Sequence, residues 1–303
     1  MSDPARRWSP ASRVFRLVAA ASLLAFWGMA CHRGEAATGA GSTRVEVVVS
    51  VPPQAWLVRR IGGDRVDVHV LLPPGASEHT YDPTPQQVAR LGAARLVVEV
   101  GHPSFLFERR LLDALLDRQP RPLVVDMTRH ADLIQERGAG SGSDPHLWLS
   151  PAVMRATAQD VAAVLGALDP AGAATYRQGL VAVLAEITAL DGDLRRELAS
   201  LAGRRFLVYH PAWGYLARDY GLEQVAIEAE GKEPSARRML DVAEMARREG
   251  LGTVFVERWS SDRSARAIAG ELGARVVTLD PLAEDWPANL RRVGGALREA
   301  LGG

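Results

Sequence analysis

From residue 44 onward, short apolar runs alternate with segments whose apolar residues recur every three or four positions. In the run RVDVHVLL, three valines alternate with Asp67 and His69, which is the period of a strand with one buried and one solvated face. A helical segment follows each run, and this order of elements predicts parallel sheets built from right-handed crossovers. The fold class that we expect is therefore α/β.

The alternation occurs twice, so we expect two lobes, each a four-stranded parallel sheet flanked by helices. The strands of the first lobe are expected within residues 44–51, 65–72, 95–101 and 121–127. Those of the second lobe are expected within residues 205–209, 223–229, 253–257 and 274–280. Each expected strand is followed by a loop and a helix, so the carboxyl ends of the strands should carry the functional side chains.

Between the two halves, leucine and isoleucine residues recur at three- and four-residue steps, which predicts one amphipathic helix. A continuous helix here would be roughly 45–50 Å long at about 1.5 Å per residue, which suits a rigid connection. Gly192 is its weak point, because glycine costs about 1 kcal/mol relative to alanine inside a helix. We predict lobes at residues 44–169 and 203–303, joined by a linking helix at residues 170–202.

The first 30 residues differ from the rest of the chain. Arginines precede the apolar run LVAAASLLAFWGMA, which is too short to span a bilayer and has the form of a secretory signal. We expect residues 1–30 to be a signal peptide and residues 31–43 to form a polar tether. Cys31, the only cysteine, lies in GMAC, which resembles the lipobox of bacterial lipoproteins. Gly28 departs from that pattern, and the alternative is plain cleavage there or near Ala37.

Composition and charge exclude some classes of function. The chain is 47% hydrophobic and 24% charged, as is typical of a soluble globular protein. Its 36 basic and 36 acidic residues balance, so it has no large cationic field. We therefore expect no nucleic-acid partner.

Three histidines and one aspartate lie in loops after predicted strands or in connections. They are His79, His146, His210 and Asp280. Since open parallel sheets bind ligands at the carboxyl ends of their strands, these side chains could meet between the lobes. Three imidazoles and a carboxylate suit a tetrahedral Zn²⁺ site. No HExxH or CxxC motif is present, so from the residues alone a shared metal site and four unrelated loop residues both stay open.

Four segments of the chain resemble, in this order, the metal-binding (zinc/manganese) class of solute-binding proteins of ABC importers. They are LPPGASEHTYDPTPQQVARLGAARLVVEVG, DPHLWLSP, VYHPAWGYLARDYGL and VVTLDPLA. The resemblance implies two α/β lobes joined by one long helix. It also implies a receptor that binds Zn²⁺ in the cleft between the lobes and delivers it to an ABC permease in the membrane. The implied ligands are His79, His146, His210 and Asp280.

Two alternatives to a zinc receptor stay open. In the family that the chain resembles, histidine at the third ligand position accompanies zinc and glutamate accompanies manganese, so His210 favours zinc. The acidic, histidine-rich loop of many zinc members is missing between His102 and Asp144, which keeps a Mn²⁺ receptor as an alternative. A zinc-dependent hydrolase is the alternative from another class, since three histidines with an open fourth position can activate water. Asp280 in that position would exclude it.

Several neighbouring residues could add to the site or serve only the structure. We expect Glu78 to be solvated and His102 to have a structural or surface role, although each could take part in metal binding. Glu228 lies in a charged loop that is solvated, closes the cleft or contacts the permease. Glu257 and Arg258 end a predicted strand and either pair with each other or hydrogen-bond a ligand histidine.

The signal peptide, Cys31 and the resemblance together predict where the protein acts. We expect a monomer in the periplasm or on the outer face of the cytoplasmic membrane, lipid-anchored through Cys31. Its partners would be a divalent metal ion and the permease. An adhesin-like surface lipoprotein is compatible with this prediction, whereas a catalytic role is not expected.

Overall fold

The computed structural model describes residues 44–302, apart from residues 74, 78–79, 114–120, 136–142, 229–233 and 259–261. All of its strands and helices lie within one compact unit, Ser42–Gly303. This unit holds two four-stranded sheets in which every strand pair is parallel. The described part of the chain thus confirms the predicted α/β class with two sheets.

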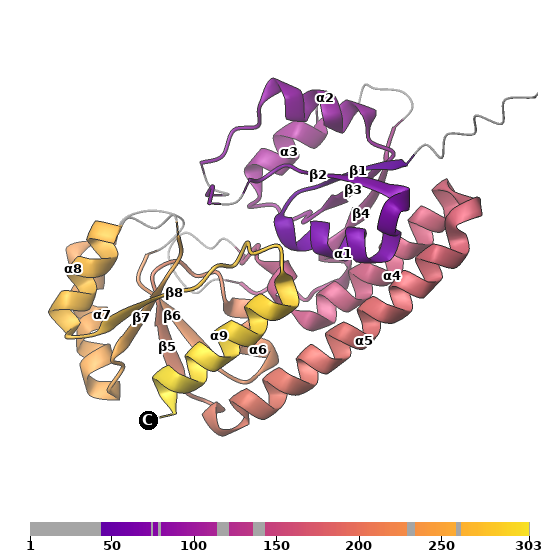
Figure 1. Cartoon of the computed structure of the whole chain (residues 1–303). Coiled ribbons are helices and arrows are strands. Elements are labelled where there is room, and N and C mark those ends of the chain that lie inside the picture. Colours follow the sequence, from indigo (N-terminus) through magenta and orange to yellow (C-terminus); the bar gives the residue numbers. More distant parts are fainter. Residues whose placement is uncertain are drawn as a thin grey trace, which may run out of the picture. The chain divides into compact units, whose positions relative to one another are not determined.

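The first sheet has the strand order β2-β1-β3-β4. Its strands are β1 (Val45–Val49), β2 (Val66–Val70), β3 (Leu96–Glu99) and β4 (Leu123–Asp126). Its helices are α1 (Pro52–Gly62), α2 (Pro85–Ala93), α3 (Leu106–Asp113) and α4 (Pro151–Leu168). In Figure 1, α1 and α4 lie on one side of this sheet and α2 and α3 on the other. The central strands β1 and β3 are covered on both faces, which is why their valines are nearly all buried.

The second sheet repeats this order as β6-β5-β7-β8. Its strands are β5 (Arg205–Val208), β6 (Glu223–Ala226), β7 (Thr253–Val256) and β8 (Arg275–Thr278). Its helices are α6 (Gly214–Asp219), α7 (Ala236–Glu249), α8 (Asp262–Leu272) and α9 (Trp286–Leu301). Short 3-10 helices occur at Gly63–Arg65, Met127–His130, Leu147–Leu149, Pro170–Gly172 and Ala199–Leu201. In each sheet the strand order reverses beside the first strand, which is where such sheets bind ligands.

The long helix α5 (Ala173–Leu198) connects the two sheets and is continuous through Gly192. It packs against α1 and α4 of the first sheet and against α9 of the second (Figure 1). Its buried stripe consists of Tyr176, Val183, Ile187, Leu190, Leu194 and Leu198. Because these side chains recur at helical spacing along one face, the packing outweighs the cost of the glycine. The predicted long linking helix is confirmed.

Helix α4 was not expected from the sequence pattern, although it is 18 residues long. Ser150 caps its start, since its hydroxyl accepts a hydrogen bond from the Val153 amide at 3.4 Å, and Pro151 occupies the first turn. Its apolar side chains contact the sheet, α1 and α5. Its buried residues form one stripe, but Ala152, Ala163 and Ala167 lie on the exposed face, so the sequence lacks the clear polar stripe by which a surface helix is recognised.

Candidate metal centre

His146 lies between β4 and α4, and its side chain is 2% exposed. The carboxylate Oδ1 of Asp144 accepts hydrogen bonds from the His146 backbone amide at 2.8 Å and from its Nδ1 at 2.7 Å. This is a tight turn closed by an aspartate side chain. Because Nδ1 carries the proton that Asp144 accepts, Nε2 is the nitrogen that bears the lone pair.

His210 follows β5, at the point where the strand order of the second sheet reverses. Its side chain is 4% exposed, and its Nδ1 lies 2.5 Å from Glu228 Oε1. The carboxylate selects the same tautomer as at His146, with the lone pair on Nε2. The carboxyl ends of two strands, β5 and β6, thus supply the imidazole and the group that orients it.

The two imidazoles face each other through their Nε2 atoms, which are 3.2 Å apart. The ring planes meet at 75° with their centroids 5.1 Å apart. Two lone pairs at this distance repel each other unless a proton or a metal ion lies between them. Two imidazole nitrogens bound to one tetrahedral Zn²⁺ at about 2.0–2.1 Å would themselves be about 3.3–3.4 Å apart. The pair therefore has the spacing of two ligands to a single ion.

Asp280 lies in the loop after β8, beside the His146 segment. Its Oδ1 accepts a hydrogen bond from the Leu282 amide at 2.9 Å, and its Oδ2 is 4.0 Å from Arg258 Nε. The next residue, Pro281, accepts a hydrogen bond from the Trp148 indole at 2.7 Å. The segment after His146 and the Asp280 loop are therefore in direct contact.

Three residues that the sequence analysis singled out for this region, His79, Glu78 and Glu257, stay predictions. His79 and its neighbour Glu78 lie outside the described residues. Glu257, at the end of β7, is buried with 2% of its surface exposed. Its bond to a ligand histidine stays a prediction, and Arg258 beside it approaches Asp280, with Nε 4.0 Å from Oδ2.

His102 is completely buried and belongs to the protein framework. Its Nδ1 accepts a hydrogen bond from the Ser104 amide at 3.1 Å, and its Nε2 lies 2.7 Å from Ser143 Oγ. Burial lowers the pKa of His102, so the ring is neutral at physiological pH. Since both ring nitrogens are engaged within the protein, this arrangement supports the structural role expected from the sequence rather than an extra metal ligand.

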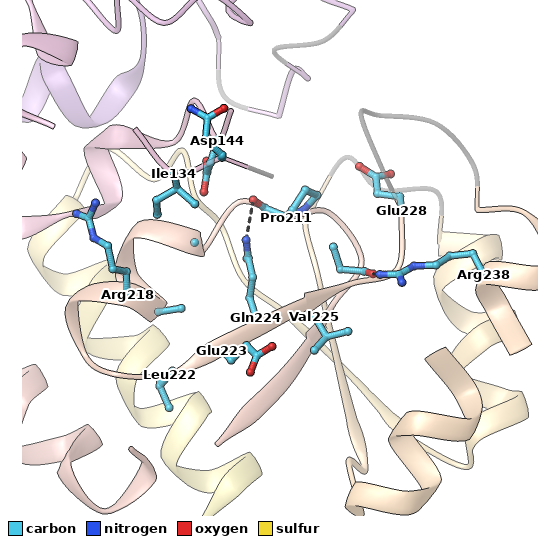
Figure 2. Close-up of a pocket in the computed structure, with 14 residues that line it drawn as sticks. Ile134, Asp144, Pro211, Arg218, Leu222, Glu223, Gln224, Val225, Glu228 and Arg238 are labelled. Carbon is cyan, nitrogen blue, oxygen red and sulfur yellow. Dashed lines mark hydrogen bonds between the residues drawn. The ribbon is translucent and has the colours of Figure 1, made fainter. Parts of the chain in front are cut away.

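A groove of about 760 Å³ lies beside the carboxylates that hold the two histidines (Figure 2). Asp144 and Glu228 both line it, and so does Gln224, whose amide donates to the Pro211 carbonyl at 3.2 Å. Asp144 Oδ2 is buried, and among the described residues it has no hydrogen-bond partner.

Sequence reasoning did not identify the functions of Asp144 and Glu228. The signal for Asp144 is its place two residues before His146, where a short carboxylate side chain can close a turn. Glu228 lies 18 residues after His210, so no local signal connects them. Only the pairing of β5 with β6 brings the two residues together.

A second group of potential ligands lies on the first sheet. Glu46, Asp67 and His69 place one ligand atom each within 4.8 Å of one another. His69 Nε2 is 3.0 Å from Glu46 Oε2, and the Arg90 guanidinium is 3.0 Å from the ring nitrogens. Because a permanent cation already lies against this partly exposed group, we assign it no metal.

Comparison with known proteins points to metal uptake. A model of the family described as zinc-uptake complex component A, periplasmic, matches residues 47–300. The zinc-binding lipoprotein AdcA of Streptococcus pneumoniae is 27% identical over 274 residues, which cover 86% of this chain and 54% of AdcA. The chain thus spans about half the length of that relative.

Solved structures give the same picture. The crystal structure of a ZnuA deletion mutant with zinc bound has a TM-score of 0.79 and 39% sequence identity, over 85% of this chain and 98% of that one. The solute-binding protein FpvC of Pseudomonas aeruginosa in complex with Mn²⁺ has a TM-score of 0.73 and 25% identity, over 86% and 99%.

Proposed function

The chain belongs to the family of periplasmic zinc-uptake components, and on this basis we propose that it captures Zn²⁺ outside the cytoplasmic membrane and delivers it to an ABC permease. The members of this family are solute-binding receptors rather than enzymes. In this proposal the metal ion is cargo. The hydrolase that three histidines alone would allow is therefore set aside.

The facing imidazoles of His146 and His210 carry the proposal. Each is held from behind by a carboxylate, and their Nε2 atoms are 3.2 Å apart. Orienting carboxylates of this kind raise the basicity of the imidazole and fix its direction. The site is thus preorganised for a cation that binds two nitrogens at once.

Nitrogen ligands favour zinc over manganese, because Mn²⁺ lies at the weak end of the order of affinities and prefers oxygen. Mn²⁺ stays the alternative cargo, since FpvC was solved in complex with that ion. We propose His79 and Asp280 as the remaining two ligands. Four protein ligands would close a tetrahedral site and leave no position for a reactive water molecule.

We further propose that residues 1–30 are a signal peptide and that Cys31 carries a lipid anchor through the tether at 31–43. The name of AdcA as a lipoprotein supports this. Among the described residues, every helix is too short or too polar to cross a bilayer. A monomer on the outer face of the cytoplasmic membrane or in the periplasm would then present its lobes to the permease.

Calorimetric titration of the metal-free protein with Zn²⁺ and Mn²⁺ tests the proposal. The protein would begin at Ser42, where the compact unit starts. We expect one zinc ion to bind per chain, more tightly than manganese, and the affinity to fall in His79→Ala, His210→Ala and Asp280→Ala. His130→Ala is the control, because His130 hydrogen-bonds Asp160 at 2.7 Å, outside the proposed ligand set. Absence of tight binding by either metal would reject the proposal.

A further inference from the structure

His102 is a buried histidine that metal capture does not use directly. It lies in the turn between β3 and α3, where Gly101 adopts a φ of +73°. The Val100 and Gly101 amides each donate to the Glu108 carboxylate at 2.7 Å, and the Phe105 amide donates to the His102 carbonyl at 2.9 Å. These bonds fix the turn, so the imidazole is presented from a rigid base.

The tautomer of His102 follows from its neighbours. A backbone amide can only donate, so the Ser104 N–H makes Nδ1 an acceptor. The proton of the neutral ring is then on Nε2, which donates to Ser143 Oγ at 2.7 Å. His102 therefore supplies a directed hydrogen bond to one particular hydroxyl group, and this bond connects the end of β3 with a segment more than 40 residues later.

Ser143 begins the short segment that carries His146. The adjacent Asp144 donates its amide to the Ile134 carbonyl at 2.9 Å and holds His146 Nδ1 with its carboxylate at 2.7 Å. A displacement of Ser143 would move Asp144 and, with it, the ring of His146. The chain of contacts thus runs from His102 through Ser143 and Asp144 to the nitrogen that faces His210.

We propose that His102 is a positioning residue for the metal site, which holds the segment of residues 143–146 so that His146 Nε2 points at His210. This inference rests on the proposed capture of Zn²⁺ by His146 and His210. Loss of groups that orient a metal-bound imidazole typically lowers metal affinity about 10- to 100-fold. We expect a loss of that size when the bond between His102 and Ser143 is removed.

The test compares zinc affinities, measured by competition with a chromogenic chelator, for the wild type, His102→Ala, His102→Gln, Ser143→Ala and the double variant His102→Ala/Ser143→Ala. Gln offers an amide N–H near the position of Nε2 and should recover part of the affinity. Both alanine variants break the same bond, so the double variant should be no weaker than the weaker single variant. The Co²⁺-loaded proteins should show a shifted ligand-field spectrum wherever affinity is lost.

Thermal unfolding of the metal-free variants separates positioning from stability. Ser143→Ala keeps the test valid even if His102→Ala fails to fold, and His130→Ala controls for loss of a histidine elsewhere. Zinc affinity within twofold of the wild type in Ser143→Ala, or additive losses in the double variant, would overturn the positioning role alone. A wild type that binds no zinc would instead overturn the proposed function and this inference together.

Discussion

The indole N–H of Trp286 donates to the backbone carbonyl of Trp148 at 2.8 Å, and both rings are fully buried. The indole of Trp148 in turn donates to the Pro281 carbonyl at 2.7 Å. Trp148 lies two residues after His146, and Pro281 follows Asp280. The two hydrogen bonds therefore hold the His146 segment of the first lobe against the Asp280 loop of the second, which sets the separation of two proposed ligands.

Replacement of Trp286 by Phe should destabilise the protein and weaken zinc binding. It removes a buried hydrogen bond and leaves the Trp148 carbonyl without its donor, which costs about 1–3 kcal/mol. Urea unfolding of the metal-free protein measures the loss of stability. Trp213→Phe is the matched control, because the Trp213 indole is buried and its N–H has no hydrogen-bond partner among the described residues. Equal losses in the two variants would show that volume, not the hydrogen bond, accounts for the effect.

The sequence predicted the architecture because it rests on repeated, local patterns. Runs of valine specify buried strands, and the leucine stripe specifies α5 even through Gly192. The same patterns placed His210 and Asp280 in loops after strands, where parallel sheets bind ligands, and His146 on a connection.

The residues that orient the site could not be predicted in the same way. Glu228 meets His210 only because β6 pairs with β5, and His102 meets Ser143 across a separation of 41 residues. Such partners are brought together by the order of the strands and the paths of the loops. Neither the composition of the sequence nor its periodicity reveals these. Helix α4 was missed for another reason: alanines at its exposed positions 152, 163 and 167 weaken the contrast between its buried and its solvated face.

Glu228→Gln should lower zinc affinity about 10-fold or more, because a neutral amide orients and polarises the His210 ring less than a carboxylate does. Competition with a chelator measures the change. Glu223→Gln is the control, since Glu223 lines the same groove but pairs with Arg205 at 3.0 Å rather than with a histidine. If both variants bound zinc equally, the carboxylate of Glu228 would have no special part in the site.

Gly214→Ala should also weaken zinc binding. A Cβ at this position, in the first turn of α6, would overlap Asp144 Oδ2 and crowd the Gln224 amide. Asp144 cannot move aside without loosening its two hydrogen bonds to His146. The measurement is the zinc dissociation rate after addition of excess chelator, which should rise.

Gly166→Ala in α4 is the control for that substitution. A Cβ at Gly166 has no neighbour within 4 Å, so alanine should stabilise the helix by up to about 1 kcal/mol and leave zinc binding unchanged. If the Gly214→Ala variant released zinc as slowly as the Gly166→Ala variant, Asp144 would tolerate displacement, and the site would not be preorganised as described above.

Glu108→Gln should change how stability depends on pH. Burial raises the pKa of the Glu108 carboxyl from 4.5 to about 8. Between about pH 5 and pH 8 the folded protein thus holds a proton that the unfolded chain has released. Glu108 therefore contributes its full stabilisation below the unfolded-state pKa of 4.5, and this contribution is lost as the pH rises through the folded-state pKa of about 8. Over this range the free energy of unfolding falls by at most about 1.4 kcal/mol per pH unit on account of Glu108.

Glutamine does not titrate, so the stability of Glu108→Gln relative to the wild type should improve steadily from pH 5 to pH 8. Urea unfolding of both proteins at each pH unit measures this difference. Glu299→Gln, at an exposed side chain, controls for removal of a carboxyl group. Parallel curves for Glu108→Gln and the wild type would mean that the amides of Val100 and Gly101, which donate to this carboxylate at 2.7 Å, keep it ionised despite its burial.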